Sequence, residues 1–282
     1  MATTVVRRGA AGVQQSWYGF WDSLGFFIGA SATAPTAGNV SHARQLYGLK
    51  EAALTIPDTE TVQITGDDDL LAEINFDSIE TRRFTASLAA EDLTLINHIQ
   101  GTVTRTWGEA SVTGLDASGL SNYNFAVWFQ SRAVGLIAPQ SGVSMWSGLI
   151  VHLAQMSWLG RESLAERAAG TFRVSITPQR ASYEITGITL QDSYAGVCNE
   201  RYATIGSEYP VTTTAFTGNN VLTTIPVLMQ PISAAKVFAT VNRVAVTVSS
   251  VTTGASPSVT LAVAPAAGSR VMIAYEYDAT NC

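Results

Sequence analysis

The segment that decides the fold is Leu70-Leu-Ala-Glu-Ile-Asn-Phe-Asp77, in which apolar and polar residues alternate. One face of an extended chain would carry Leu70, Ala72, Ile74 and Phe76, and the other would carry Leu71, Glu73, Asn75 and Asp77. The same period of two recurs in Arg83–Leu88 and in Thr171–Thr177. It predicts half-buried strands, and therefore a β protein whose sheets have one apolar and one mainly polar face.

One segment departs from this period. Leu88, Leu95, Ile96 and Ile99 recur at helical spacing, Glu91 and Asp92 fall in the first turn, and Gly101 follows the end. Acidic residues favour a helix N-terminus and glycine favours the C-terminal end, so the pattern predicts one helix beginning near Ala89 and packed on a sheet. A change of phase across Gly187 predicts a β-bulge or bend. Val143–Leu159 mixes both periods, and Arg161–Ala169 fits a short helix or a turn.

The composition changes near Glu208-Tyr209-Pro210, which predicts two domains. Residues 209–282 contain 12 Thr and 12 Val in short runs separated by turn residues, with 3 basic and 2 acidic side chains. Residues 1–208 contain 13 basic and 20 acidic side chains, so they carry the acidity of the chain. We expect a β domain with an N-terminal arm over residues 1–208 and a small Ig-like β-sandwich over residues 209–282.

The chain has an unusually low content of charge. Only 13% of its 282 residues are charged, 46% are hydrophobic and the net charge is −6. A protein that binds DNA or RNA needs clustered Lys and Arg, so nucleic-acid binding is not the expected function. Residues 17–34 are interrupted by Asp22 and three glycines, so neither a membrane span nor a secretory signal is expected there. We expect instead a surface largely covered by other protein.

No stretch carries a catalytic signature. The chain lacks G-x-S-x-G, P-loop, G-x-G-x-x-G and H-E-x-x-H patterns, and His98 has no signature Ser or Cys beside it, so we expect no catalytic residues. We expect no metal and no cofactor, because the chain has only two Cys, Cys198 and Cys282, and three scattered His. A disulfide between the two Cys is left as an alternative to free thiols. Gly66-Asp67-Asp68-Asp69 fits a turn between strands better than a cation site.

A cluster of six aromatic residues lies near the N-terminus: Trp17, Tyr18, Phe20, Trp21, Phe26 and Phe27. A stacking platform for single-stranded nucleic acid needs a basic groove, and the only charge here is Asp22. Large aromatics dominate protein interfaces, so an arm that contacts a neighbouring subunit is one interpretation of the cluster. Core packing within the same chain is the other.

The segment Glu51-Ala-Ala-Leu-Thr-Ile-Pro57, followed by Glu60-Thr-Val-Gln-Ile-Thr-Gly-Asp-Asp68 and the strand Leu70 to Phe76, resembles the major tail tube proteins of long-tailed bacteriophages. The shared pattern is a strand, a P-x-x-x-x-V-x-x-x-G-D-D turn, a second strand and a crossing helix. Glu166–Phe172 is similar to the element that ends the tube domain, so the resemblance covers about residues 45 to 195.

The C-terminal stretches Ala235–Asn242, Ala264–Gly268 and Val271–Tyr277 are similar to small β modules of phage tail, fibre and decoration proteins. Arg243 stands where that pattern commonly has glycine after Asn, which leaves the turn type open.

The resemblance implies a tube domain of two packed antiparallel sheets, a sandwich or barrel, with one helix and the C-terminal sandwich on the tube exterior. It implies a structural virion protein, not an enzyme. The copies assemble in the host cytoplasm into hexameric rings that stack into the virion tail. Its partners would be further copies of itself, the tape measure, terminator and distal tail proteins, and double-stranded DNA that passes without specific binding. No membrane partner is implied.

The resemblance also suggests a role for the polar face of the predicted strand Leu70–Asp77, which would line the lumen of the tube. A lumen lined by Glu73, Asn75 and Asp77 would repel the phosphates of DNA in transit. Two alternatives stay open: the inner tube of a contractile tail or injection machine, and a β-rich adhesin or carbohydrate-binding protein, which the Thr-rich C-terminal segment favours. An enzyme is the last alternative.

Overall fold

A computed structural model describes most of the chain: residues 8–31, 33–46, 49–55, 60–66, 69–76, 83–88, 93–100, 102–107, 110–115, 124–135, 145–161, 172–179, 183, 185, 202–207 and 209–279. Antiparallel strands dominate, and α1 (Leu93–Gln100) is the single α-helix of this described part. The all-β class with one helix is therefore confirmed.

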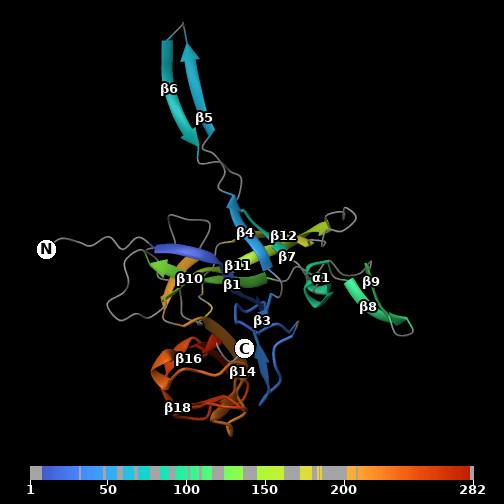
Figure 1. Ribbon diagram of the computed structural model, residues 1–282, viewed down its shortest axis with the longest axis vertical. Coiled ribbons are helices and arrows are strands. Elements are labelled where there is room, and N and C mark those ends of the chain that lie inside the picture. Colours follow the sequence, from blue (N-terminus) through green and yellow to red (C-terminus); the bar gives the residue numbers. More distant parts are fainter. Residues whose placement is uncertain are drawn as a thin grey trace, which may run out of the picture.

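The larger sheet has eight strands in the order β3-β1-β10-β11-β12-β7-β4, with β13 paired to β11 (Figure 1). Its strands are β1 (Arg8–Trp21), β3 (Arg44–Gln45), β4 (Leu49–Thr55), β7 (Arg83–Leu88), β10 (Asn124–Gly135), β11 (Met145–Arg161), β12 (Phe172–Pro178) and β13 (Tyr202–Ser207). β11 pairs with β10 and β13 through its first half and with β12 through its second half. Ile150, Val151 and Ala154 are buried near its centre, where both faces are covered, which explains why its sequence lacks a clean period of two.

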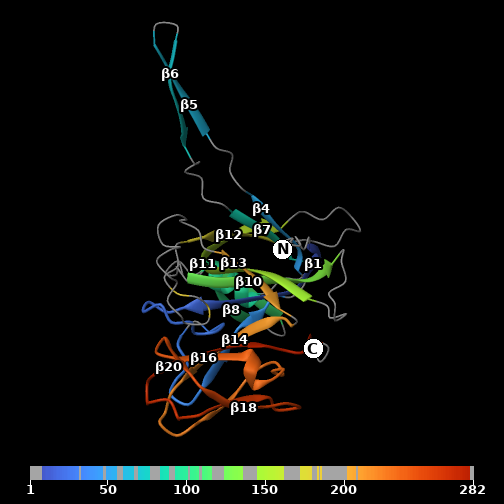
Figure 2. The ribbon, with the colours of Figure 1, turned by 90° about the vertical axis from the view of Figure 1, so that its left-hand side faces the viewer.

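The C-terminal part is built from two smaller sheets (Figure 2). One has the order β17-β16-β20-β14-β2 and the other β15-β19-β18. Their strands are β2 (Val40–His42), β14 (Val211–Thr217), β15 (Thr224–Pro226), β16 (Val237–Val241), β17 (Val244–Val246), β18 (Val248–Thr252), β19 (Ser258–Leu261) and β20 (Arg270–Glu276). We call this unit the C-terminal sandwich. Its edge strand β2 comes from the N-terminal part of the chain.

Strand β1 contributes to two hydrophobic cores because its side chains alternate between the faces of the larger sheet. Tyr18 and Phe20 join a core with Leu95 of α1. Trp17 and Trp21 join the other core, most of whose members come from the C-terminal sandwich; β10, β11, Phe27, Ala43 and Ile185 supply the rest. The larger sheet is therefore covered by α1 on one face and by the C-terminal sandwich on the other.

Two hairpins extend from the sheets. β5 (Glu60–Gly66) pairs with β6 (Asp69–Phe76), and β8 (Thr102–Trp107) pairs with β9 (Ala110–Leu115). The β5–β6 hairpin projects beyond β4, away from the rest of the described chain (Figures 1 and 2). Its register places Gly66 opposite Asp69, so the two strands of the hairpin meet at this end; Asp67 and Asp68, where the sequence predicts a turn, lie outside the described residues.

Several sequence-based boundaries need correction. The helix begins at Leu93, not near Ala89, because Leu88 ends β7 and pairs with Phe172 of β12. Strand β14 was not expected from the sequence. Thr212, Thr213 and Thr214 are all buried in it, so the strand is covered on both faces, but threonine is polar and gives no apolar pattern in the sequence. Gly187, Glu91, Asp92, both Cys and residues 162–169 lie outside the described residues.

Candidate functional site

The candidate site is the junction where the larger sheet meets the C-terminal sandwich. At its centre, Trp17 and Trp128 of the larger sheet are fully buried, with Tyr275 and Tyr277 of the sandwich in the same core. The Trp17 and Tyr277 rings meet edge to face, with centroids 5.8 Å apart, and Trp17 Nε1 donates a hydrogen bond to Tyr277 Oη at 3.1 Å. The contact therefore stabilises the junction in two ways: it buries the apolar surface of both rings, and it gives the indole N–H a hydrogen-bond acceptor.

A second connection fixes the start of β14 to β10. The Gln130 side chain is 2% exposed and bonds to Val211 as a peptide group would: Val211 N donates to Gln130 Oε1 at 2.6 Å, and Gln130 Nε2 donates to Val211 O at 2.8 Å. Trp128 Nε1 donates to the same carbonyl at 3.0 Å. A buried amide without partners is costly, so these bonds hold the two units in one register.

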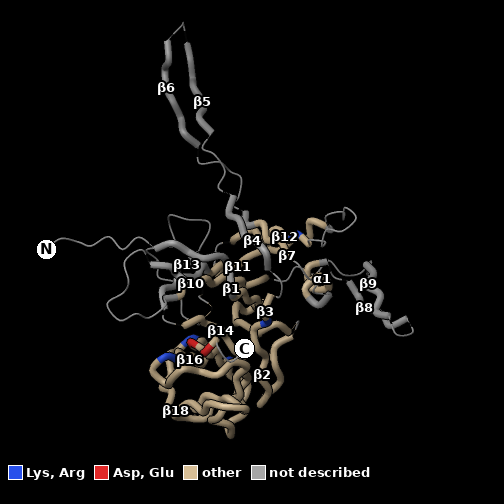
Figure 3. The backbone as a smooth tube through the Cα atoms, viewed as in Figure 1, with Lys and Arg blue, Asp and Glu red and all other residues tan. Residues whose placement is uncertain are grey.

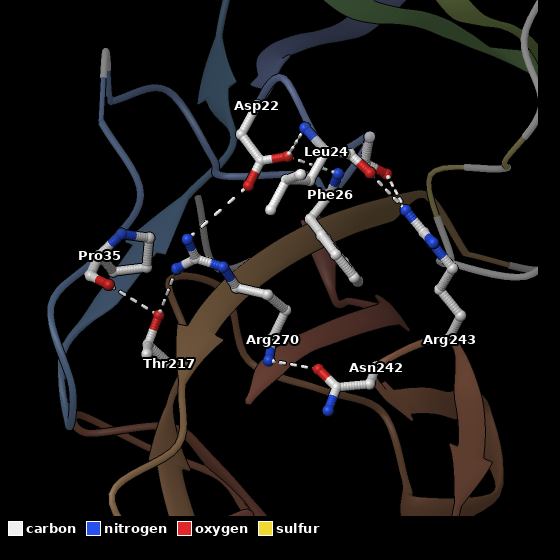
Figure 4. Close-up of polar contacts among 9 residues, drawn as sticks. Asp22, Leu24, Phe26, Pro35, Thr217, Asn242, Arg243 and Arg270 are labelled. Carbon is white, nitrogen blue, oxygen red and sulfur yellow. Dashed lines mark hydrogen bonds and ion pairs between the residues drawn. The ribbon is translucent and has the colours of Figure 1, made fainter. Parts of the chain in front are cut away.

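At the rim of the junction, Asp22 organises a tight turn (Figure 4). Its Oδ1 accepts from Leu24 N at 3.0 Å and from Phe26 N at 2.9 Å, and its Oδ2 lies 3.7 Å from Arg270 Nη2. The same carboxylate therefore caps the turn of residues 22–26 and attracts a strand of the sandwich.

Arg243 makes the other rim contact. Its guanidinium carbon lies 4.1 Å from the centroid of the Phe26 ring and 3.8 Å from that of Tyr183. Its Nη2 donates to Leu24 O at 2.5 Å (Figure 4). Arg243 sits in the two-residue turn between β16 and β17 with φ 70°, next to Asn242 with φ 47°. These angles match a type I′ hairpin turn, which favours Asn-Gly; arginine there costs roughly 1–2 kcal/mol relative to a residue with ordinary φ.

A hydrogen-bonded chain runs from β2 into the sandwich. His42 Nδ1 lies 3.0 Å from Thr214 Oγ1, and burial lowers the pKa of His42 from its usual 6.5. Burial also raises the pKa of Tyr275 to about 12, while its hydroxyl accepts from Met229 N at 3.2 Å. A hollow of about 460 Å³ lies beside His42, and Arg44, Gln45 and Trp17 are among the residues that line it.

The lowered pKa of His42 predicts a pH dependence of stability. Above pH 6.5 the imidazole is neutral in both states; below it, the unfolded chain binds a proton that the folded chain resists, so the free energy of unfolding falls. We expect His42→Gln to lose less stability than the wild type between pH 6.5 and about 5. Melting temperatures of both proteins across this range measure the difference, and equal slopes would contradict it.

Five of the six N-terminal aromatic residues are buried within the chain itself. Trp17, Trp21 and Phe27 belong to the junction core, and Tyr18 and Phe20 belong to the core under α1. This burial fits the core-packing interpretation, and it corrects the expectation of an inter-subunit arm, because side chains that fill the chain's own cores are not available to a neighbour. Phe26 is partly buried and contacts Arg243.

Two of the three residues assigned to a lumen lie on the β5–β6 hairpin, which projects away from the junction (Figure 1). Glu73 and Asn75 belong to β6, opposite Gln63 and Thr61 of β5, and Asp77 lies outside the described residues. No sequence pattern pointed to Gln130 or Arg270, and Arg243 was noticed only as a departure from a turn glycine, without a role.

Within the described residues, no three or more His, Cys, Asp or Glu side chains gather into a group that could hold a metal ion. The part of the chain that the structure describes contains no helix long and apolar enough to cross a membrane.

Comparison with known proteins adds no family to this geometry. The chain matches no protein-family model, and no curated protein matches it.

Proposed function

We propose that the chain is a structural protein that polymerises into stacked rings and forms the tail tube of a long-tailed phage, a conduit for double-stranded DNA. The observation that carries this proposal is the β5–β6 hairpin. It extends beyond the larger sheet, and its register pairs Val62 with Ile74 and Ile64 with Ala72, so apolar pairs alternate with polar ones. A two-stranded hairpin alone is marginally stable in water, so an amphipathic one gains stability from a second surface. A neighbouring copy supplies that surface.

The distribution of charge supports self-assembly. Residues 244–269 contain no charged residue, and the tube drawn over β18 is uniformly uncharged (Figure 3). The chain has only two lysines, Lys50 and Lys236, although lysine is the usual means of keeping sheet edges from pairing. A subunit surrounded by copies of itself needs little such protection.

The polar pairs of the hairpin provide a candidate lumen surface. Glu73 opposite Gln63 and Asn75 opposite Thr61 alternate with the apolar pairs, so contact with a neighbour through one face leaves the other for the bore. An acidic bore repels DNA and allows rapid passage. The tape measure, terminator and distal tail proteins would be further partners, and the tube would assemble in the host cytoplasm.

The two alternatives differ in their support. The inner tube of a contractile tail or injection machine needs the same subunit contacts, so the tail type stays open. A sugar-binding adhesin commonly presents aromatic rings. In residues 209–279 the described rings of Phe216, Tyr275 and Tyr277 are buried, and those of Tyr209 and Phe238 are partly buried. This gives the adhesin less support.

Negative-stain electron microscopy of the purified chain tests the proposal. We expect rings or tubes about 100 Å wide, the width of several domains of ordinary compactness around a bore. A chain that stays monomeric at every concentration and salt condition tried would contradict it.

The lumen assignment predicts a charge effect. Replacing Glu73 and Asp77 by lysine should leave assembly intact, because neither residue belongs to the apolar row, yet the bore should then bind DNA. Sedimentation of assembled tubes with short duplex DNA at low salt measures this. Equal DNA binding by wild-type and variant tubes would place these residues away from the bore.

A further inference from the structure

The turn between β16 and β17 places an arginine where the backbone favours glycine. Both Asn242 and Arg243 have positive φ, and Asn-Gly is the pair that such a turn accommodates best. The backbone alone therefore gives no reason for arginine at position 243. The contacts of its side chain must therefore offset the conformational free energy that arginine costs in the turn.

That side chain joins two segments distant from it in sequence. The guanidinium carbon lies over both the Phe26 ring and the Tyr183 ring, and the carbonyl of Leu24 accepts from Nη2. The turn of residues 22–26 fits closely around it: Gly25 has φ 75°, and a Cβ there would lie 3.1 Å from the Tyr183 ring and 3.4 Å from Arg243 Nη2.

The contact lies at the rim of the junction and not in its core. Leu24, whose carbonyl takes part in the contact, is 68% exposed, and Val244, which follows Arg243, is 66% exposed. The central contacts, by contrast, involve fully buried rings and a buried amide. Contacts at an exposed rim open locally at lower free energy than buried ones.

We propose that Arg243 is a latch: the guanidinium, held against the Phe26 and Tyr183 rings, fixes the turn of residues 22–26 to the C-terminal sandwich. When the latch opens, this side of the junction is released while both sheets stay folded. The latch acts in the isolated chain as well as in an assembly, so it does not depend on tube formation.

Hydrogen exchange of the purified full chain tests the latch. Arg243→Gly keeps a favourable turn and removes the side chain, and Arg243→Lys keeps the charge but loses the planar stacking group. In both variants we expect the amides of Leu24, Gly25 and Phe26 to exchange about tenfold faster than in the wild type. The amides of Asn242 and Arg270, which bond across the β16–β20 pair, should not change.

Lys236→Gln is the matched control. It removes a cation from the other end of β16, where Lys236 pairs with Glu276 at 3.4 Å, and should leave the turn of residues 22–26 protected. Tyr183→Leu removes one ring without touching the hairpin turn, and it carries the test if Arg243→Gly does not fold. Wild-type protection in Arg243→Gly, or in Tyr183→Leu where that variant carries the test, would overturn the latch. Full protection in Arg243→Lys would overturn the role of the stacked rings.

Discussion

A chain that ends at Ser207 is expected to lose its cooperative unfolding transition and to aggregate. This deletion removes β14 to β20, and with them one side of the junction core. Trp17 and Trp128, both fully buried in the complete chain, would face water, and Gln130 would lose its partner Val211. Loss of packing around one large aromatic costs about 3–5 kcal/mol, and the stability of a whole domain is about 5–15 kcal/mol. Several such losses together exceed what the larger sheet can tolerate.

Size-exclusion chromatography and thermal unfolding measured by circular dichroism distinguish the outcomes. A chain that ends at Ala279 is the control, because it retains every contact of the junction described above and should behave as the complete chain does. A soluble chain 1–207 with a cooperative transition would show that the larger sheet folds independently of the sandwich.

The sequence predicted local structure better than the contacts between units. Alternation in Leu70–Asp77 and Arg83–Leu88 predicted β6 (Asp69–Phe76) and β7, because a period of two depends only on neighbours along the strand. The change of composition near Tyr209 coincides with the passage from β13 to β14. Composition does not reveal a shared core, since Trp17, Trp128 and Tyr277 are brought together by topology alone.

The junction illustrates what could not be predicted. The six clustered aromatics were compatible with an interface arm or with a core, and only the alternation of β1 between two cores distinguishes them. The Asn-Arg turn was visible in the sequence as a departure from Asn-Gly. Its meaning required the positions of Phe26 and Tyr183, which are separated from Arg243 by 217 and 60 residues.

Charges on the apolar row of the β5–β6 hairpin are expected to abolish assembly. The variant carries Val62→Asp and Ile64→Asp, two residues that the register places opposite Ile74 and Ala72. An unpaired carboxylate buried in a subunit contact costs several kcal/mol, and every ring repeats the contact in each copy. We expect the concentration needed for assembly to rise more than about 100-fold. The melting temperature of the chain should change little, because the hairpin projects away from the sheets (Figures 1 and 2).

The matched control places the same two charges on the same strand at the alternate positions, as Thr61→Asp and Gln63→Asp. These residues pair with Asn75 and Glu73, so their row would face the bore, where carboxylates stay hydrated. Turbidity and electron microscopy of both variants over a concentration series then identify the contact face. Assembly of the control but not of the Val62/Ile64 variant is the expected result. If both variants assemble like the wild type, the hairpin makes no subunit contact; if only the control fails, the polar row meets the neighbour and the lumen must be lined by another strand.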